Sequence, residues 1–381
     1  MDPARRLVAS VLVALALLVG LDAVIANVDV FTPLVPDWRP TTLFAQMNRQ
    51  VVDVVRTLYR PPPGPPPVVF LGNSLLENGI RPLGVLERTL VAAGAPPGTQ
   101  ALSFCVFGTA PTDAEVIARS LGRVRPGVVI IGLGATDVGT PLEHARRMPV
   151  THVLDTGFRD GLVPPADWEG RFDRWVRTSW RLYRYRALFH DLVRPPDEQR
   201  TPTSPRAREQ VQTPAELLET AFGPERAHEI LALRATFDRT GAVDDFVHYV
   251  DLFRGQDYVT GLRERWQALE IEPLQLEALR RFVAHVRDAG GRPVWLLMPE
   301  NPVFARDPVV GPLVARGSDA VAARLASEAA VLDVPLLDLR RAMPVSAFAD
   351  YNHLFRTGVF FPVLTKALAD RGLLAAPARA G

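Results

Sequence analysis

Five short, almost uninterrupted apolar runs restrict the fold of this chain more than any other feature of its sequence. They are VVFLG (68–72), ALSFCVF (101–107), VVIIGLG (128–134), PVWLLMP (293–299) and VPLLDL (334–339). Runs of this length without polar alternation are typical of strands that are buried on both faces. Helical patterns occur between them, at about 82–94, 113–123, 274–290 and 319–330. The alternation predicts an α/β fold with a parallel sheet covered on both faces, in which sites lie beyond the carboxyl ends of the strands.

The first segment of the chain predicts a membrane anchor. After Arg5 and Arg6, an apolar run extends from Leu7 to Val28, and roughly 20 such residues suffice to cross a bilayer as a helix. Arginines before the run and no basic cluster just after it place the N-terminus on the cytoplasmic side of the membrane. We therefore expect residues 7–28 to contact the lipid bilayer as a single-pass anchor in the inner or plasma membrane, with the remainder extracytoplasmic. A signal peptide cleaved after Val24-Ile25-Ala26 and a buried core helix are the alternatives.

The rest of the chain divides by composition. The run PPPGPPP (61–67) favours extended polyproline II and marks a domain boundary. The strand pattern is missing between about 141 and 272, where Arg, aromatic and helical patterns replace it, with a polar patch at 194–214. The predicted parts are a signal anchor (1–28), a juxtamembrane segment and Pro-rich linker (29–67), a first part of the α/β core (68–140), a largely helical insertion (141–272) and a second part of the core (273–376).

The insertion contains a series of aromatic residues flanked by arginines. The series consists of Trp175, Trp180, Tyr183, Tyr185 and Phe189. Aromatic side chains at such spacing are most often core residues, so we expect them to form the core of the insertion. A sugar-binding groove and contact with the membrane surface are the alternatives.

Charge and composition exclude several classes of function. The net charge of +1 gives no overall field that would attract nucleic acid. Cys105 is the only cysteine, which excludes an intrachain disulfide and a zinc site built on several thiolates. The only lysine is Lys366, so a P-loop is absent. The histidines other than His353 form no metal-binding motif, and we predict neither a metal nor an organic cofactor.

Gly72-Asn73-Ser74 follows the first predicted strand and precedes a helix. A serine at such a turn is well placed for a nucleophile, because the helix N-terminus supplies backbone N–H groups and a favourable dipole for a developing oxyanion. An ordinary helix-capping role for Ser74 is the structural alternative.

Asp350 and His353 lie close to the C-terminus, before a probable helix at 357–369. A serine nucleophile needs a base, and the base needs an acid that fixes its tautomer. An aspartate three residues before a histidine can supply both on one turn. A surface loop with a capping Asp and an incidental His is the structural alternative.

In this order, the two motifs resemble the first and last blocks of the SGNH/GDSL hydrolases. Gly108, after the second strand, fits the second block, and Gly134-Ala135-Thr136-Asp137 fits the Gly-x-Asn-Asp pattern of the third, except that Thr136 replaces Asn. Asn73 likewise replaces the usual Asp. The resemblance implies a flavodoxin-like three-layer sandwich, a Ser74–His353–Asp350 triad, and an oxyanion hole formed by Ser74, Gly108 and Thr136.

The SGNH-like proteins that accompany O-acylation of cell-surface polymers, the DltD-like and alginate-acetylation proteins, resemble this chain more closely. The features involved are the N-terminal span, RLYRYR in the insertion, LLMPENP and DYNHLFRTG. The resemblance implies acyl transfer to or from a carbohydrate or another envelope polymer, beside a multi-span membrane acyltransferase as partner.

The candidate substrate-binding residues are Asn73, Asp137, Glu300 and Asn301, with helix capping as the alternative for the last two. Three functions compete, and Thr136 separates the first from the second. The first is a serine esterase or O-acyltransferase acting on acetyl or other acyl esters. The second is a non-catalytic SGNH-like binding or assembly subunit, because a threonine hydroxyl is shorter than the amide that the family uses as an oxyanion donor. The third is a lipid or small-ester hydrolase.

Overall fold

The structure of the chain is a computed structural model. The structure describes residues 3–25, 38–39, 43–141, 164–180, 213–255, 257–267, 269–308 and 311–375, together with residues 146, 148, 150, 183 and 201–202. The end of the predicted anchor (26–28), most of the juxtamembrane stretch at 29–42, nearly all of the polar patch at 194–214 and residue 376 lie outside the described residues.

A parallel sheet of five strands forms the centre of the molecule, as the apolar runs predict. Its strands are β2 (Val68–Gly72), β3 (Ala101–Cys105), β4 (Val128–Leu133), β6 (Arg292–Leu297) and β7 (Leu336–Asp338). Their order across the sheet is β3-β2-β4-β6-β7. Val68 pairs with Ala101 on one side and with Val128 on the other. β3 ends before the predicted residue 107, because the chain turns from Val106 to Thr109.

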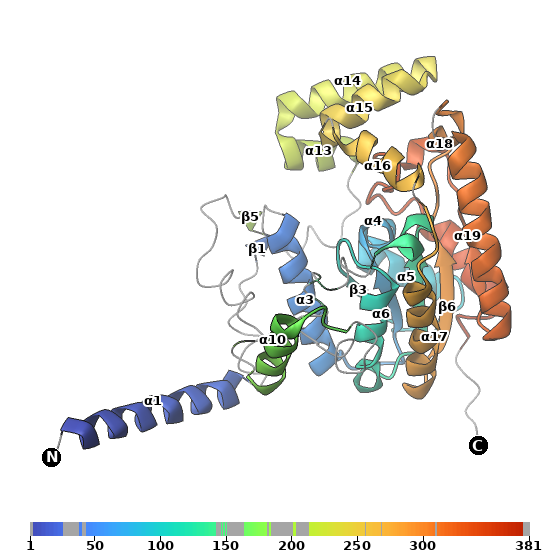
Figure 1. Cartoon of the computed structure of the whole chain (residues 1–381). Helices are drawn as coiled ribbons and strands as arrows, with labels where there is room; N and C mark the ends of the chain where they lie inside the picture. The colour runs from blue at the N-terminus through green and yellow to red at the C-terminus, as the bar shows by residue number, and fades with distance from the viewer. Residues whose placement is uncertain are drawn as a thin grey trace.

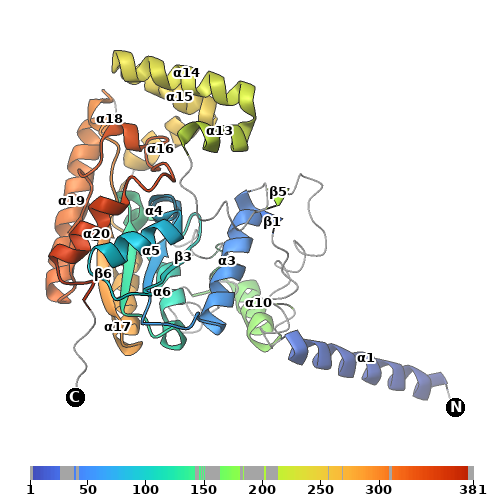
Figure 2. The ribbon, with the colours of Figure 1, turned by 180° about the vertical axis from the view of Figure 1, so that it is seen from behind.

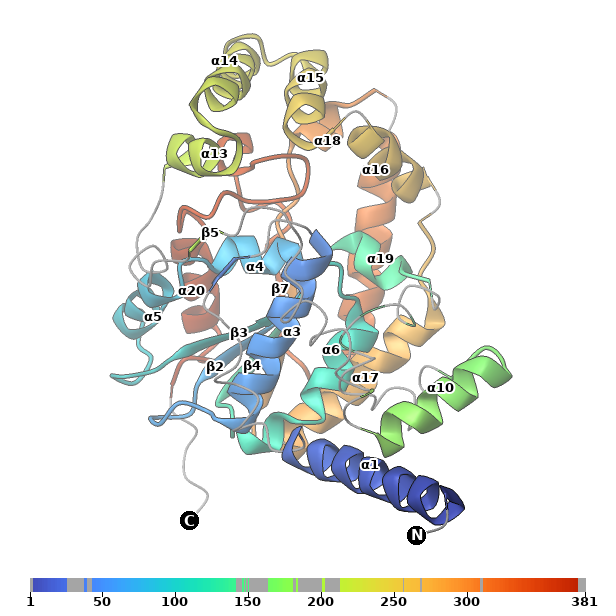
Figure 3. The same ribbon diagram turned by 90° about the vertical axis from the view of Figure 1, so that its left-hand side faces the viewer.

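Alternate residues of each strand enter two separate hydrophobic cores. In β2, Val69 and Leu71 belong to one core, whereas Val68 and Phe70 belong to the other. The same alternation in β4 and β6 explains why these strands are apolar throughout, since neither face meets water. Figure 3 shows α5 and α20 on one side of the sheet, and α6, α17 and α19 on the other. The prediction of an α/β fold with a covered parallel sheet is confirmed.

The helices around the sheet agree with the sequence patterns in position but less well in extent. They are α3 (Leu43–Tyr59), α5 (Leu83–Ala92), α6 (Pro111–Ala118) with the 3₁₀ turn η2 (Leu121–Arg123), α17 (Pro273–Asp288), α19 (Gly311–Val331) and α20 (Phe361–Asp370). Helix α19 starts well before the predicted residue 319, in a stretch whose Gly and Pro residues hide the helical pattern. Helix α20 starts later than residue 357, because Gly358 has a left-handed backbone (φ +72°).

Helices dominate the described part of the predicted insertion. They are α10 (Trp168–Ser179), α13 (Pro214–Phe222), α14 (Pro224–Thr240), α15 (Val243–Arg254) and α16 (Asp257–Gln267). Helices α13 to α15 lie at one end of the molecule, close to the short helix α18 (Val303–Arg306), and α10 lies towards the other end (Figures 1 and 2). The two-residue strands β1 (Trp38–Arg39) and β5 (Thr201–Pro202) form a separate antiparallel pair.

The aromatic series of the insertion is not the core that its spacing predicts. Trp175 is 61% exposed and Trp180 is 43% exposed. Tyr183 is partly buried and donates a hydrogen bond to Asp173, whereas Tyr185 and Phe189 lie outside the described residues. The prediction is wrong for the two tryptophans. Helix α10 buries Arg177 and leaves Trp175 exposed, and Trp180 follows the end of the helix.

The first helix, α1 (Pro3–Ile25), is long and apolar enough to cross a membrane. Its stretch Arg5–Val24 has a mean hydropathy of 2.6, and none of it is buried against the protein. The lack of burial argues against the alternative of a core helix. A membrane anchor and a signal sequence near an N-terminus pass the same test of length and composition. It therefore stays a prediction that α1 is retained as an anchor and that the rest of the chain is extracytoplasmic.

Candidate active site

Ser74 lies at the junction between the first strand of the sheet and the helix that follows it. It is the first residue of α4 (Ser74–Ile80), and its backbone N–H therefore has no acceptor within that helix. Asn73 caps the helix, because its Oδ1 accepts a hydrogen bond from Leu75 N at 2.9 Å. The capping role that was the alternative for Ser74 thus belongs to Asn73. Gly72 allows the close approach to β4, where a Cβ would meet Gly132 O at 3.1 Å.

Ser74 and His353 are in hydrogen-bonding contact although 279 positions separate them. Ser74 Oγ lies 2.9 Å from His353 Nε2. The other ring nitrogen, Nδ1, lies 3.0 Å from Asp350 Oδ1 and 2.9 Å from Asp350 Oδ2. The structure therefore brings together the three residues of the predicted triad. Hydrogen-bonding contacts link the serine hydroxyl to the imidazole and the imidazole to the carboxylate.

Asp350 is held in the ionised form although it is fully buried. Burial by itself would raise the pKa of its carboxyl, but the charges of His353 and Arg254 and several hydrogen bonds outweigh it and keep that pKa well below the usual range. Oδ1 accepts hydrogen bonds from the backbone N–H groups of Asn352 and His353, each at 2.8 Å. A permanent carboxylate at this position can orient the imidazole and stabilise its protonated form.

Arg254 was not identified from the sequence. It is the last residue of α15 in the insertion, and its Nε donates to Asp350 Oδ2 at 2.7 Å. Its guanidinium also stacks on the ring of Phe253, 4.4 Å from the centroid. A basic residue in the last turn of a helix is favourable for the helix dipole in general, so its position gave no signal for contact with a distant carboxylate.

The insertion also holds the backbone of the loop that carries Asp350. Arg234, which is 7% exposed, donates to Phe348 O at 2.8 Å and to Val345 O at 2.9 Å. Tyr249 donates to Ala349 O at 2.5 Å, and burial raises the pKa of its hydroxyl to about 12, so it remains a donor. The loop includes the short helix η5 (Val345–Ala347). Three side chains of α14 and α15 thus fix both the backbone and the carboxylate of this loop.

Asn301, in the segment that follows β6, supports the same loop. It is 1% exposed, its Nδ2 donates to Asp350 O at 2.9 Å, and its Oδ1 accepts from Val303 N at 3.0 Å. Glu300 is turned towards other groups, with Oε1 accepting from Ser318 Oγ at 2.5 Å and Oε2 lying 3.4 Å from Arg341. These contacts favour structural roles for both residues, and the substrate contacts predicted for them stay predictions.

Thr136 and Asp137 follow the central strand β4 in the 3₁₀ helix η3 (Ala135–Gly139). Asp137 Oδ1 accepts from Asn73 Nδ2 at 2.9 Å, and Oδ2 accepts from Gly134 N at 2.7 Å. These bonds tie η3 to the residue before Ser74. Burial raises the pKa of Asp137 to about 7 despite the two hydrogen bonds. Thr136 is partly buried, and its carbonyl oxygen accepts from Thr140 Oγ1 at 3.5 Å.

Gly108 lies in the turn after β3, where its backbone is left-handed with φ +75°. The turn is closed by the hydrogen bond from Thr109 N to Val106 O at 3.2 Å, and Thr109 Oγ1 donates to Gly72 O at 2.8 Å. The second bond joins this turn to the end of β2. The roles of Gly108, Thr136 and the Ser74 N–H as oxyanion donors stay predictions.

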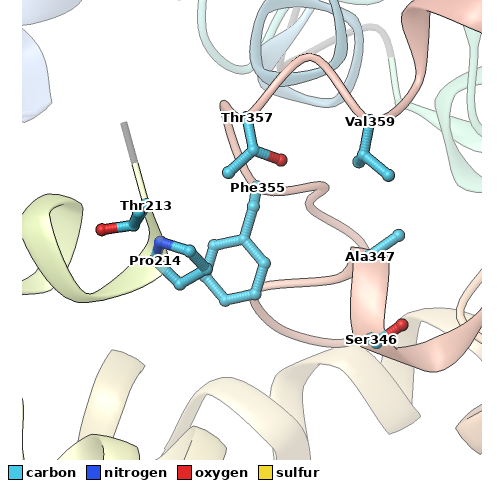
Figure 4. Close-up of a pocket in the computed structure, with 7 residues that line it drawn as sticks. All are labelled: Thr213, Pro214, Ser346, Ala347, Phe355, Thr357 and Val359. Atoms are coloured by element: carbon cyan, nitrogen blue, oxygen red, sulfur yellow. The ribbon is translucent and has the colours of Figure 1, made fainter. Parts of the chain in front are cut away.

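A shallow hollow of about 290 Å³ lies along the loop that follows His353. Thr213 and Pro214 line it from the start of α13, and Phe355, Thr357 and Val359 line it from the loop (Figure 4). Its lining is mostly apolar. Among the residues that the structure describes, no group of three or more His, Cys, Asp or Glu side chains is arranged to hold a metal ion.

No protein-family model matches this chain, and no curated protein matches it by sequence. A function is therefore inferred from the hydrogen bonds around Ser74 and from the sequence motifs that contain these residues.

Proposed function

We propose that the protein is a serine ester hydrolase or O-acyltransferase that works through an acyl-Ser74 intermediate. The observation that carries this proposal is the hydrogen-bonded chain from Ser74 Oγ to His353 Nε2 and from His353 Nδ1 to the buried Asp350. A serine, a base within hydrogen-bonding distance and a third group that orients the base are the components of nucleophilic acyl transfer.

In the proposed reaction, Ser74 Oγ attacks the carbonyl carbon of an acyl ester while His353 Nε2 takes the serine proton. The tetrahedral intermediate collapses, the bond to the leaving alcohol breaks, and the imidazolium returns its proton to that alcohol. Water or an acceptor hydroxyl then gives its proton to His353 and attacks the acyl-serine. Release of the acid or the new ester restores the Ser74 hydroxyl. Asp350 stays ionised throughout and stabilises the imidazolium.

Negative charge on the carbonyl oxygen requires donors near Ser74. The backbone N–H of Ser74 at the start of α4 is one candidate, and the Gly108 N–H and the Thr136 hydroxyl are the others. Loss of one donor typically lowers the rate by about 10²–10³-fold. A threonine in place of the family asparagine therefore fits an enzyme that is slow on simple esters.

Membership of the SGNH/GDSL hydrolases is the family assignment that we propose. It is supported by the order of the motifs along the chain and by the strand order β3-β2-β4-β6-β7, which follows the 2-1-3-4-5 pattern of flavodoxin-like sheets. The two cores on opposite faces are consistent with the three-layer sandwich of that family. Three parts of the proposal rest on the sequence resemblance. They are the acyl group, which we take to be acetyl, the carbohydrate or envelope-polymer acceptor, and the multi-span acyltransferase partner. The same holds for the extracytoplasmic location.

Thr136 also favours a second candidate, a non-catalytic binding or assembly subunit that retains the fold but lacks an efficient oxyanion hole. The mostly apolar hollow beside the His353 loop would suit the third candidate, a lipid or small-ester hydrolase. Turnover and acyl-enzyme formation distinguish the first and third candidates from the second.

The test is pre-steady-state hydrolysis of p-nitrophenyl acetate by the full-length protein in detergent. We expect a burst of p-nitrophenol and a mass increase of one acetyl group on the peptide that contains Ser74. Ser74→Ala should abolish both, whereas Ser327→Ala, at an exposed serine of α19, should preserve both. Folded wild-type protein that shows neither would argue for the binding subunit, provided that membranes containing the partner acyltransferase also restore neither.

A further inference from the structure

Helix α10 presents three large aromatic side chains to solvent on one face. Trp168 is 66% exposed, Phe172 is 57% exposed and Trp175 is 61% exposed. Their spacing of i, i+4 and i+7 places them on the same side of the helix. The rings of Phe172 and Trp175 are in contact, with centroids 5.8 Å apart. We call Trp168, Phe172 and Trp175 the aromatic face of α10.

The opposite side of α10 is charged, although it is the side that faces the protein. Arg177 is only 5% exposed and forms an ion pair with Asp173. Asp173 also accepts a hydrogen bond from Tyr183 at 2.8 Å. An amphipathic helix on a soluble protein normally buries its apolar face and exposes its charges. Helix α10 has the reverse orientation, and no described part of the chain covers its aromatic face.

The position of α10 in the fold indicates what lies there. Helices α10 and α1 lie at the same end of the molecule in all three views, while α13 to α15 lie at the opposite end (Figures 1, 2 and 3). Helix α1 carries the stretch that is long and apolar enough to cross a bilayer. An anchor at that end would keep the aromatic face close to the membrane surface.

We propose that the aromatic face of α10 lies in the interfacial layer of the lipid bilayer and acts as a second membrane contact beside α1. Tryptophan is enriched at this depth, because its ring is amphipathic and sits at the level of the headgroups. Arg171 is exposed at the edge of the aromatic face and can pair with anionic headgroups. The contact would fix the orientation of the domain, with the end that carries α13 to α15 directed away from the membrane.

Quenching by brominated lipids measures this contact directly in the full-length protein. The protein is reconstituted in phosphatidylcholine and phosphatidylglycerol vesicles, with and without bromine on the acyl chains. Helix α1 contains no tryptophan, so the signal does not report the anchor. Trp168 and Trp175 are two of the chain's six tryptophans, and we expect the brominated lipid to remove roughly one third of the emission through them.

The double variant Trp168→Phe with Trp175→Phe keeps the face apolar and should abolish that part of the quenching. The matched control, Trp266→Phe with Trp295→Phe, removes two buried tryptophans and should leave the bromine-dependent loss unchanged. Equal emission in the two kinds of vesicle would refute the proposal, and so would quenching that survives in the double variant. Disulfide crosslinking between copies carrying Phe172→Cys in a Cys105→Ser background would instead show that a second copy covers the face, and this would overturn the proposal.

Discussion

Removal of the positive charge of Arg254 tests whether the insertion takes part in the function of the triad. The variant Arg254→Met keeps most of the length of the side chain, but loses the 2.7 Å hydrogen bond and ion pair with Asp350. It also loses the stacking of the guanidinium on Phe253. Asp350 is completely buried and retains three partners, His353 and two backbone N–H groups. The change therefore weakens the environment of the carboxylate without isolating it.

The magnitude follows from the burial of the two partners. Removing one partner of a fully buried ion pair costs about 3–5 kcal/mol, whereas an exposed pair contributes about 0–1 kcal/mol. The Arg254 side chain is 33% exposed and that of Asp350 is 0% exposed. We expect an intermediate loss of about 1–2 kcal/mol in the free energy of unfolding, and a fall in kcat/KM of about 3- to 10-fold, since tenfold corresponds to about 1.4 kcal/mol.

The assay is the pH dependence of p-nitrophenyl acetate hydrolysis, together with thermal unfolding in detergent. Arg254 is one of the charges that keep the pKa of Asp350 low. Its loss should raise that pKa, so that Asp350 becomes protonated at a less acidic pH and the acidic limb of the kcat/KM profile moves to higher pH. A variant that was only less stable would not move this limb. Arg281→Met is the matched control, because Arg281 is about as exposed as Arg254 but pairs with Glu277 on α17, whose side chain is 43% exposed. An Arg254→Met protein with wild-type stability and an unshifted profile would refute the role of Arg254.

Three further predictions concern the oxyanion hole, a buried acid and the anchor. Thr136→Asn should raise esterase turnover by about 10²–10³-fold if the new amide reaches the oxyanion; unchanged kcat in folded protein would contradict this. Burial raises the pKa of Asp113 from its ordinary 3.8 to about 7. Between pH 3.8 and about 7, the folded protein therefore keeps a proton on Asp113 that the unfolded chain has already lost. The contribution of the protonated carboxyl to the free energy of unfolding is complete below pH 3.8 and is lost as the pH rises to about 7. Asp113→Asn should accordingly reduce the fall in melting temperature between pH 5 and pH 8, and an equal fall in both proteins would count against it. A periplasm-active reporter fused after Gly381 should be active, and a mature N-terminus near Asn27 would show a cleaved signal instead of an anchor.

The sheet could be predicted from the sequence because each strand is buried on both faces and so carries an unbroken apolar run. The strand β4, Val128–Leu133, is an example, because all six of its residues are buried and the apolar run marks its position in the sequence. Ser74, Asp350 and His353 could be predicted to meet from their order along the chain. Ser74 follows β2, and Asp350 and His353 lie in the connection between the last strand, β7, and α20, while the carboxyl ends of parallel strands converge on one edge of the sheet.

The surroundings of the triad could not be predicted in the same way. Arg254 reaches Asp350 only because α15 packs against a loop almost a hundred residues further along the chain, and no local pattern distinguishes it from the many other arginines. The spacing of Trp168, Phe172 and Trp175 predicts one apolar face but not whether that face turns inwards. Asn301 was recognised as close to the site, but its bond to Asp350 O depends on tertiary packing alone.

The most direct measurement of the central claim is labelling of the full-length protein in membranes with a fluorophosphonate, followed by mass analysis of its peptides. An activated serine reacts with such a probe, whereas an ordinary hydroxyl does not. The proposed triad predicts one adduct, on Ser74, which is lost in Ser74→Ala and forms much more slowly in His353→Ala, while Ser327→Ala labels as the wild type does. Folded wild-type protein without an adduct on Ser74, or labelling at Ser74 that is equally fast without His353, would contradict it.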